Sequence, residues 1–171
     1  MDVAIRSVRP DDASQLRAVE RDAGERFRTV GLAAIADNEP TSEAFIDAIS
    51  AHGIAFCAVD DTDRPIGFLL AGRLDQALHV YELSVMTAWA GRGIGRRLMA
   101  EIADAAHTLG TPSLTLATFR DVPWNGPYYE RNGFVEVAQD EWTPAFHLLH
   151  AAERLAGLPI ERRVFMRKEI A

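Results

Sequence analysis

The stretch of sequence that decides the fold is Gly91-Arg92-Gly93-Ile94-Gly95-Arg96-Arg97. An apolar segment with the character of a strand, residues 78–86, precedes it, and a second such segment, residues 114–117, follows. Between the two, apolar side chains recur with the spacing of one helical stripe, at Ile94, Leu98, Ile102, Ala105 and Leu109. A strand, a glycine-rich turn, a helix and a strand in this order predict a parallel strand pair joined by a right-handed crossover.

The glycine-rich turn also predicts a binding site for an anion. Glycines let the backbone approach a ligand closely, and the free amides and the macrodipole at a helix start favour negative charge. Arg92, Arg96 and Arg97 add positive charge at the same turn. We therefore expect a phosphorylated cofactor here. The alternative is that the glycines only shape a tight turn and that the arginines form a solvated face.

Two common phosphate-binding motifs do not fit this turn. A P-loop needs Gly-Lys-Ser/Thr, whereas Gly95 is followed by two arginines, which disfavours hydrolysis of ATP or GTP. A dinucleotide fold places Gly-x-Gly-x-x-Gly in its first strand–helix–strand unit, whereas this chain has Gly-x-Gly-x-Gly near its middle. NAD is therefore a weak candidate for the ligand.

The segments around this unit predict an α+β fold built on a mixed sheet. Strands are expected at residues 3–8, 54–59, 66–70 and 163–170, with a further one from Phe134. Helices are expected after Pro10-Asp11-Asp12, after Thr41 and Ser42, near residues 129–132 and around 146–155. Because no repeat or flexible linker interrupts this series, one domain over residues 1–171 is expected.

The composition excludes several classes of protein. The chain has 171 residues, of which 48% are hydrophobic and 25% charged, as in ordinary globular domains. A formal net charge of −7 disfavours binding to nucleic acid or to an anionic membrane surface. The only cysteine, Cys57, lies in an apolar segment and is expected to be a buried thiol. Since no segment approaches the ~20 apolar residues of a membrane span, and residues 1–9 lack the apolar part of a secretion signal, we expect a cytoplasmic location.

Three segments, in this order, resemble the GNAT superfamily of acyl-CoA-dependent N-acyltransferases. They are Leu83-Ser84-Val85 on a strand, the glycine-rich turn, and Tyr129-Glu130-Arg131-Asn132-Gly133-Phe134. The resemblance implies a mixed, mostly antiparallel sheet with helices on both faces and two central parallel strands that splay apart. It also implies acetyl-CoA as co-substrate, with its pantetheine arm in the gap and its pyrophosphate on the turn. The cofactor-binding residues that it implies are Leu83, Ser84, Val85, Gly91, Arg92, Gly93, Ile94, Gly95 and Arg96.

The sequence departs from the family pattern at two positions. Ala90 stands where the pattern usually has glutamine or arginine, so we expect one side-chain contact to the cofactor to be weakened while the backbone contacts remain. The asparagine often found seven residues before the tyrosine is absent. Asn125 lies four residues before Tyr129 instead, and it is a further candidate for cofactor binding.

Acyl transfer from a thioester to an amine needs a deprotonated amine, a polarised carbonyl and a proton for the leaving thiolate. The resemblance places the backbone N–H of Val85 where it can polarise the carbonyl. Glu82 is the candidate general base, acting through water, and its alternative role is a carboxylate on the strand surface. Tyr129 matches the tyrosine that protonates the thiolate in many members, because a phenol with a pKa of about 10 stays protonated at neutral pH. Its alternative role is packing on Phe134, with its hydroxyl bonded to the backbone.

The function expected from the sequence is that of an N-acetyltransferase. It would move the acetyl group of acetyl-CoA to a primary amine, of a small molecule or a peptide, by direct attack in a ternary complex. The alternative is a non-catalytic acyl-CoA-binding or regulatory module. Residues 23–40 and 138–159, which should shape the acceptor site, carry no motif, so the acceptor is not predicted.

Three further features concern the acceptor, a metal and the oligomeric state. Glu20, Asp22 and Glu25 on the first helix either attract a cationic amine or form a solvated face. His147 and His150 have the spacing of a ligand pair, but no third ligand is evident, so no metal is expected. An exposed last strand would allow pairing across a homodimer.

Overall fold

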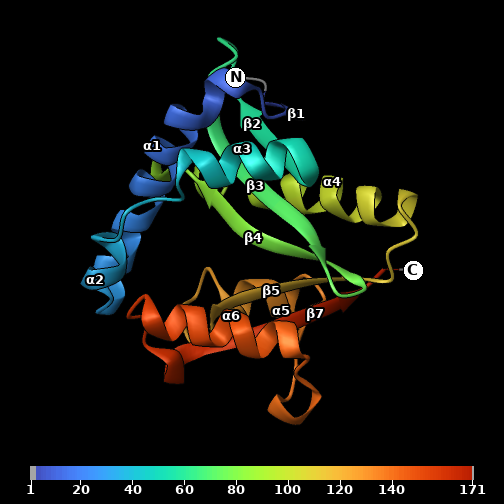
Figure 1. The fold of residues 1–171 in the computed structure, drawn as a ribbon. Helices are drawn as coiled ribbons and strands as arrows, with labels where there is room; N and C mark the ends of the chain where they lie inside the picture. The colour runs from blue at the N-terminus through green and yellow to red at the C-terminus, as the bar shows by residue number, and fades with distance from the viewer. Residues whose placement is uncertain (1–2, 171) are drawn as a thin grey trace. The chain divides into compact units, whose positions relative to one another are not determined.

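The structure is a computed structural model that describes residues 3–170 (Figure 1). Met1, Asp2 and Ala171, which belong to the expected domain 1–171, lie outside the described residues. The strands are β1 (Ala4–Ser7), β2 (Ile54–Val59), β3 (Pro65–Leu74), β4 (Ala77–Val85), β5 (Ser113–Phe119), β6 (Val135–Glu136) and β7 (Arg163–Glu169). The helices are α1 (Ala13–Gly24), α2 (Ala33–Ala36), α3 (Glu43–His52), α4 (Ile94–Thr108), α5 (Gly126–Arg131) and α6 (Pro144–Leu155).

The strand order is β1-β2-β3-β4-β5-β7-β6, and within residues 3–170 the sheet is mostly antiparallel with one parallel pair. The expected α+β class with a mixed sheet is therefore confirmed. The chain divides into two units, one of Met1–Gly72 and Val80–Ala105 and one of Arg73–His79 and Ala106–Ala171. One domain over the whole chain stays a prediction. In the part of the chain that the structure describes, no helix has the length and apolar character needed to cross a membrane.

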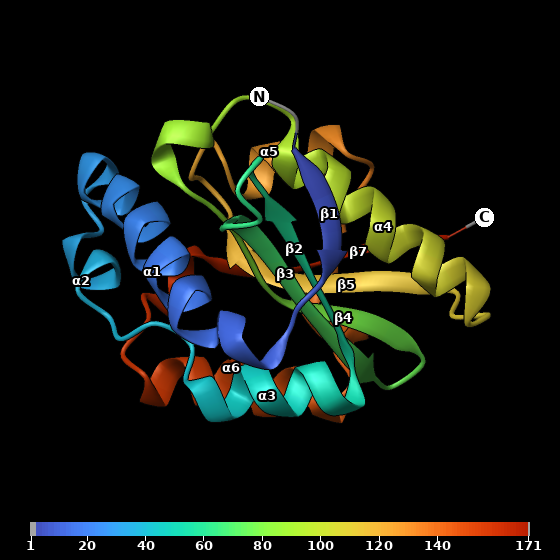
Figure 2. The ribbon, with the colours of Figure 1, turned by 90° about the horizontal axis from the view of Figure 1, so that it is seen from above.

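In the first unit, strand β2 pairs antiparallel with β1 on one side and with β3 on the other. Helices α1 and α3 lie on one face of these strands, and α4 lies on the other (Figure 2). A strand covered on both faces has no solvent side, so its sequence need not alternate between apolar and polar residues. This explains why β3 begins with eight consecutive buried residues.

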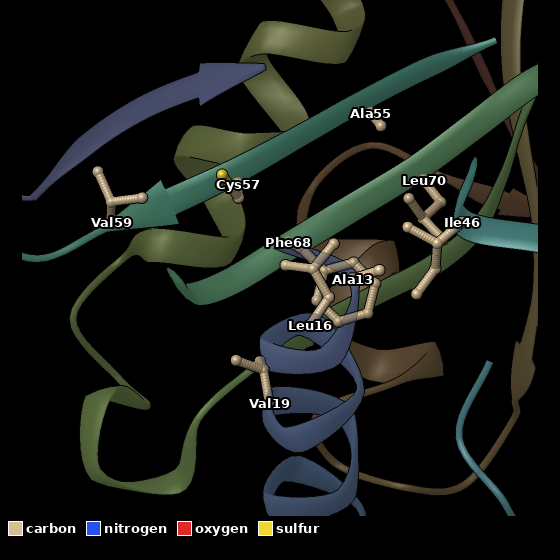
Figure 3. Close-up of a cluster of buried hydrophobic side chains, with 9 residues drawn as sticks. All are labelled: Ala13, Leu16, Val19, Ile46, Ala55, Cys57, Val59, Phe68 and Leu70. Atoms are coloured by element: carbon tan, nitrogen blue, oxygen red, sulfur yellow. The ribbon is translucent and has the colours of Figure 1, made fainter. Parts of the chain in front are cut away.

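The core of the first unit lies between helices α1 and α3 and strands β2 and β3 (Figure 3). Leu16 and Val19 of α1 are fully buried there, as the helical spacing predicted, and so is Phe68 of β3. Each such side chain contributes roughly 1.5–3 kcal/mol through its removal from water. Cys57 belongs to this cluster and is fully buried, so the expectation of a buried thiol is confirmed, and burial raises the pKa of the thiol to about 11.

A carboxylate fixes the entry to α1. The side chain of Asp12 accepts hydrogen bonds from the backbone N–H of Arg9 and from Nη1 of Arg6, both at 2.7 Å. Burial by itself would raise the pKa of Asp12, but these bonds outweigh it and the pKa is lowered. The sequence predicted a cap within residues 10–12, and the helix proper begins one residue later, at Ala13. Ser42, as predicted, caps α3 by accepting a bond from the backbone N–H of Phe45.

In the second unit, β7 pairs antiparallel with β5 on one side and with the short β6 on the other. The ring of Phe146 from α6 stacks on Phe165 of β7, with centroids 4.3 Å apart. Arg163 of β7 forms an ion pair with Glu153 of α6, and both side chains are largely buried. The strand expected from Phe134 is short, with Val135 and Glu136 paired to β7 and one further bond, from the N–H of Val137 to the carbonyl of Phe165.

A buried histidine in this unit predicts a loss of stability in mild acid. His79 is 3% exposed, and its Nδ1 lies 2.9 Å from the hydroxyl of Thr115. Burial, with a smaller contribution from Arg163, lowers its pKa from 6.5 to about 4. Between these two values the unfolded chain binds a proton that the folded chain does not. The free energy of unfolding should therefore fall as the pH drops from about 6.5 to 4, by on the order of 3 kcal/mol.

Urea unfolding of His79→Gln measures this effect, because glutamine does not titrate. The variant should lose most of the pH dependence in that window, whereas His52→Gln, at an exposed position, should keep it. Equal slopes for His79→Gln and the wild type would show that His79 is not the responsible group.

Candidate active site

The glycine-rich turn lies between the end of β4 and the start of α4. After Val85 the chain forms a 3-10 turn over Thr87–Trp89, and α4, 15 residues long, begins at Ile94. Gly91 and Gly93 both have φ of 76°, a conformation that other residues rarely adopt, although the space around them is open. The turn thus needs glycine for its backbone shape and opens directly into the start of a long helix, where the amides and the dipole favour an anion.

The three arginines of this turn differ in what their side chains contact. Arg92 lies over the ring of Trp89, with its guanidinium carbon 4.8 Å from the ring centroid. Arg97 donates a hydrogen bond from Nη2 to the carbonyl of Val3, at 2.8 Å, which directs its charge toward the N-terminal strand. Arg96 is exposed in the first turn of α4. The structure therefore leaves Arg92 and Arg96, rather than all three, as cations for a ligand at the turn.

The acidic residues of the first helical segment have partners within the protein. The carboxylate of Asp22 accepts a hydrogen bond from the backbone N–H of Thr87 at 2.5 Å, and the Thr87 hydroxyl donates to the Asp22 carbonyl. Glu20 accepts from the backbone N–H of Thr41, and Glu25 pairs with Arg28. Asp22 thus fixes the turn that precedes the glycines, a role that the sequence did not suggest.

The side chains of strand β4 do not alternate regularly between the two faces of the sheet up to the turn. The ring of Tyr81 packs edge-on against Phe45 of α3, with centroids 5.4 Å apart. A Cβ at Gly67 would lie 3.2 Å from Cγ2 of Val85 and 3.3 Å from Cγ2 of Ile94, so Val85 lies on the α4 side. Residues four apart in a regular strand share a face. The alternation is therefore interrupted once between Tyr81 and Val85, in the segment that carries Glu82.

Glu82, the candidate base, has a hydrogen-bond partner on its own strand. Its Oε1 accepts from the hydroxyl of Ser84, at 2.7 Å. Glu82 is partly buried and Ser84 is 7% exposed. The carboxylate is therefore held by a neighbouring hydroxyl, which is compatible with both roles expected for it.

Tyr129, the candidate acid, is held in the second unit by a tight turn and by ring packing. Its backbone N–H donates to the carbonyl of Asn125 at 3.0 Å, and the N–H of Asn125 donates to Val122 at 2.8 Å. The side chain is 8% exposed, and its ring packs edge-on against Phe134 with centroids 5.6 Å apart. The packing contact expected as the alternative role is thus present. This ring contact is compatible with both roles expected for Tyr129, and the acid role stays a prediction.

Asn125 carries a buried acceptor. Its Oδ1 has no hydrogen-bond partner within residues 3–170. A buried carbonyl oxygen without a partner is costly, so such an atom calls for an explanation. A ligand that donates an N–H to this atom would remove the cost, which agrees with the expected role of Asn125 in cofactor binding.

The turn before Tyr129 depends on a glycine, and this gives a second stability prediction. A Cβ at Gly126 would lie 2.4 Å from the carbonyl oxygen of Arg120, a backbone atom that cannot move aside. Gly126→Ala should therefore displace the start of α5 and lower the free energy of unfolding by roughly 3 kcal/mol, as severe overpacking does.

The matched control for this substitution is Gly24→Ala at the end of α1. There a Cβ meets only Cα of Ala36 at 3.9 Å, and φ is −62°. This change should leave stability unchanged or raise it by up to about 1 kcal/mol. Denaturant unfolding measures both variants, and equal stabilities would contradict the close approach at Gly126.

The histidine pair on α6 belongs to an aromatic cluster. The rings of His147 and His150 lie 5.4 and 5.0 Å from the ring of Trp142, measured between centroids. Within the described range 3–170, no group of three His, Cys, Asp or Glu side chains has the arrangement of a metal site.

The expected site residues fall into the two units. Glu82, Leu83, Ser84, Val85 and the turn residues 91–96 belong to the first, and Asn125 and Tyr129 belong to the second. Sequence reasoning missed Asp22, which holds the turn through Thr87, and the link between Ser84 and Glu82. Spacing within the chain gave no signal for Asp22, because its partner is 65 residues away.

Comparison with known protein families gives one match that covers most of the chain. The model of the acetyltransferase (GNAT) family matches residues 16–134, which include most of α1, strand β4, the glycine-rich turn and Tyr129. More than half of the chain therefore follows the pattern of a single family.

Solved structures with the same fold align with almost the full length of the chain. The PaiA N-acetyltransferase of Thermoplasma acidophilum, in complex with coenzyme A, has 16% identity and a TM-score of 0.73, with 99% of each chain covered. The ribosomal-protein-S18-alanine N-acetyltransferase of Escherichia coli has 16% identity and a TM-score of 0.68, over 99% of this chain and 95% of that one. The N-acetylglutamate synthase of Neisseria gonorrhoeae, with coenzyme A and N-acetyl-glutamate, has 18% identity and a TM-score of 0.74, over 100% and 36%. At these identities the likeness shows the fold.

Proposed function

The chain belongs to the acetyltransferase (GNAT) family, and we propose that it transfers the acetyl group of acetyl-CoA to a primary amine. The observation that carries this proposal is the turn at residues 91–93, where two glycines in the left-handed conformation open a long helix directly after β4. Such a turn suits the pyrophosphate of coenzyme A, because free amides and the helix dipole both stabilise negative charge. Structural neighbours that contain coenzyme A support the same ligand.

In this proposal the cofactor is bound mainly by backbone groups. Leu83, Ser84 and Val85 offer theirs along the end of β4, and residues 91–96 offer theirs around the pyrophosphate. Arg92, held over Trp89, places a cation beside the same phosphates. The orphan Oδ1 of Asn125 accepts an amide N–H of the pantetheine arm.

The reaction we propose is a direct attack of the amine on the thioester carbonyl. Glu82, through water, takes the proton that the amine must lose, and the N–H of Val85 stabilises the developing oxyanion. The new C–N bond then replaces the C–S bond. Tyr129 donates its hydroxyl proton to the departing thiolate, so coenzyme A leaves as the thiol.

The state of Cys57 favours direct transfer over an acyl-enzyme. An acyl-enzyme on cysteine requires an accessible thiolate. Cys57, the one cysteine of the chain, is fully buried in the core of the first unit, and burial raises the pKa of its thiol to about 11. We therefore propose a ternary complex of enzyme, acetyl-CoA and amine.

Ligand-dependent melting tests the cofactor assignment. A ligand at a hundred times its Kd adds about 2.7 kcal/mol to the free energy of unfolding, which raises Tm by roughly 5–10 °C in a chain of this size. Coenzyme A and acetyl-CoA should both produce this shift, and NAD should not. A shift with NAD alone would assign the turn to a dinucleotide and overturn the proposal.

A panel of primary amines and amino-terminal peptides tests the transfer, with release of free thiol from acetyl-CoA as the readout. We expect slow release without an amine and faster release with at least one member of the panel. Tight binding of coenzyme A without stimulation by any amine would favour a non-catalytic acyl-CoA-binding module.

The fold does not determine which amine is the acceptor, where in the cell the enzyme works or whether it forms a dimer. The names of the neighbours point to different acceptors, the alanine of ribosomal protein S18 in one and glutamate in another, so the shared fold does not select one. A small-molecule amine and a peptide amine are both compatible with the proposal. The cytoplasmic location and the homodimer expected from the sequence stay predictions.

A further inference from the structure

Strand β4 carries a hydroxyl whose role the proposed function does not use. The side chain of Ser84 donates to Oε1 of Glu82 at 2.7 Å, and the two residues lie two apart on the same strand. We infer that Ser84 is a positioning residue, whose hydroxyl holds the carboxylate of Glu82 in the orientation required of a general base. This inference rests on the proposed function, because it assigns a second residue to the same step.

The surroundings of Ser84 argue against a role in packing alone. Ser84 is 7% exposed, and a buried hydroxyl normally needs a hydrogen-bond partner. An alanine would fit a covered strand position without needing a partner. The buried hydroxyl of serine, in contrast, needs a polar neighbour that accepts its hydrogen bond. That neighbour is the carboxylate of Glu82.

The backbone that carries this pair is held independently of it. A Cβ at Gly67 of β3 would lie 3.1 Å from the carbonyl oxygen of Ser84 and 3.2 Å from Cγ2 of Val85. Strand β3 therefore approaches β4 closely at this point, and Ile94 of α4 covers the same position. The backbone N–H of Met86 also donates to the carbonyl of Ile66, at 2.9 Å. Because this bond joins backbone groups, removal of the Ser84 hydroxyl leaves it in place.

The geometry of the pair suits the positioning of a base. A glutamate side chain has three rotatable bonds, and fixing one of its oxygens reduces the orientations that the other can take. A hydroxyl donates one hydrogen and remains neutral, so it orients the carboxylate and leaves its negative charge unbalanced. An arginine in the same place would neutralise that charge. The bond forms within one strand, so it spans few residues and needs no second element to close.

The first test is the pair Ser84→Ala and Ser84→Thr, assayed with acetyl-CoA and the amine of the panel that releases thiol fastest. Ser84→Ala should lower kcat about tenfold, which corresponds to about 1.4 kcal/mol in the barrier. The KM for acetyl-CoA and the melting shift with coenzyme A should stay within about twofold of the wild type. Ser84→Thr keeps the hydroxyl and should restore most of kcat, although the added methyl group lowers Tm. A rise in KM with unchanged kcat would overturn the inference and give the side chain a contact with the cofactor.

The second test asks whether Ser84 acts through Glu82. If it does, Ser84→Ala should have no further effect in a Glu82→Gln background, so the two losses should not add. Additive losses would overturn the inference. A normal kcat for Glu82→Gln would remove Glu82 as the base and overturn this inference with it, whereas no stimulation of the wild type by any amine would remove the proposed function itself. If Glu82→Gln lowers kcat and Ser84→Ala leaves it unchanged, only the role of Ser84 is wrong.

Discussion

Replacing Glu82 with glutamine is expected to lower kcat about 100-fold while the protein still binds coenzyme A. General base catalysis contributes on the order of 10²–10⁴ in rate, and glutamine keeps the size of the side chain but cannot accept the proton. The amide oxygen can still accept the bond from Ser84, so the fold around β4 should survive. Steady-state rates of thiol release, at saturating acetyl-CoA and amine, measure the change.

The control for this variant is Glu25→Gln, the same chemical change at an exposed glutamate that pairs with Arg28. It should leave kcat within about twofold of the wild type, since a single exposed pair contributes little. If Glu82→Gln also stayed within twofold, another group or bulk water would deprotonate the amine.

The second large effect is expected for Tyr129→Phe, which removes one oxygen atom from a well-packed ring. Without a proton donor the thiolate must leave as an anion, so turnover should fall about 100-fold. The edge-on contact with Phe134 involves the ring and remains in the variant, so binding of coenzyme A should be kept. Single-turnover thiol release separates this chemical step from product release.

Tyr128→Phe is the matched control, because Tyr128 is the neighbouring tyrosine on α5 and its ring contacts that of Tyr129. It should retain turnover within a few-fold of the wild type. Equal rates for Tyr129→Phe and Tyr128→Phe would leave Tyr129 with a role in packing only.

The parts of the fold that the sequence predicted well are those set by local patterns. The apolar stripe from Ile94 onward predicted α4, and Gly110 ends it with φ of 63°. The glycines at positions 91 and 93 predicted the turn, because left-handed backbone nearly always needs glycine. These signals depend on residues within one or two helical turns, and a single sequence contains them in full.

The parts that the sequence did not predict depend on partners that are distant in the chain. Asp22 looked like a solvated or substrate-attracting acid, and it holds the turn at Thr87, 65 residues away. Arg97 looked like part of the phosphate site, and its guanidinium bonds to Val3, 94 residues away. The interrupted alternation of side chains in β4 cannot be recognised in the sequence, because both faces of the strand are covered.

Direct transfer from acetyl-CoA to an amine can be followed in a single-turnover reaction with acetyl-CoA labelled in the acetyl group. The enzyme, in excess over the labelled cofactor, is mixed with the most active amine of the panel, and the reaction is quenched at short times. We expect the label to pass from acetyl-CoA to the amine and the denatured protein to carry none at any time. Label bound to the protein before it appears on the amine, or label that never reaches an amine, would contradict direct transfer.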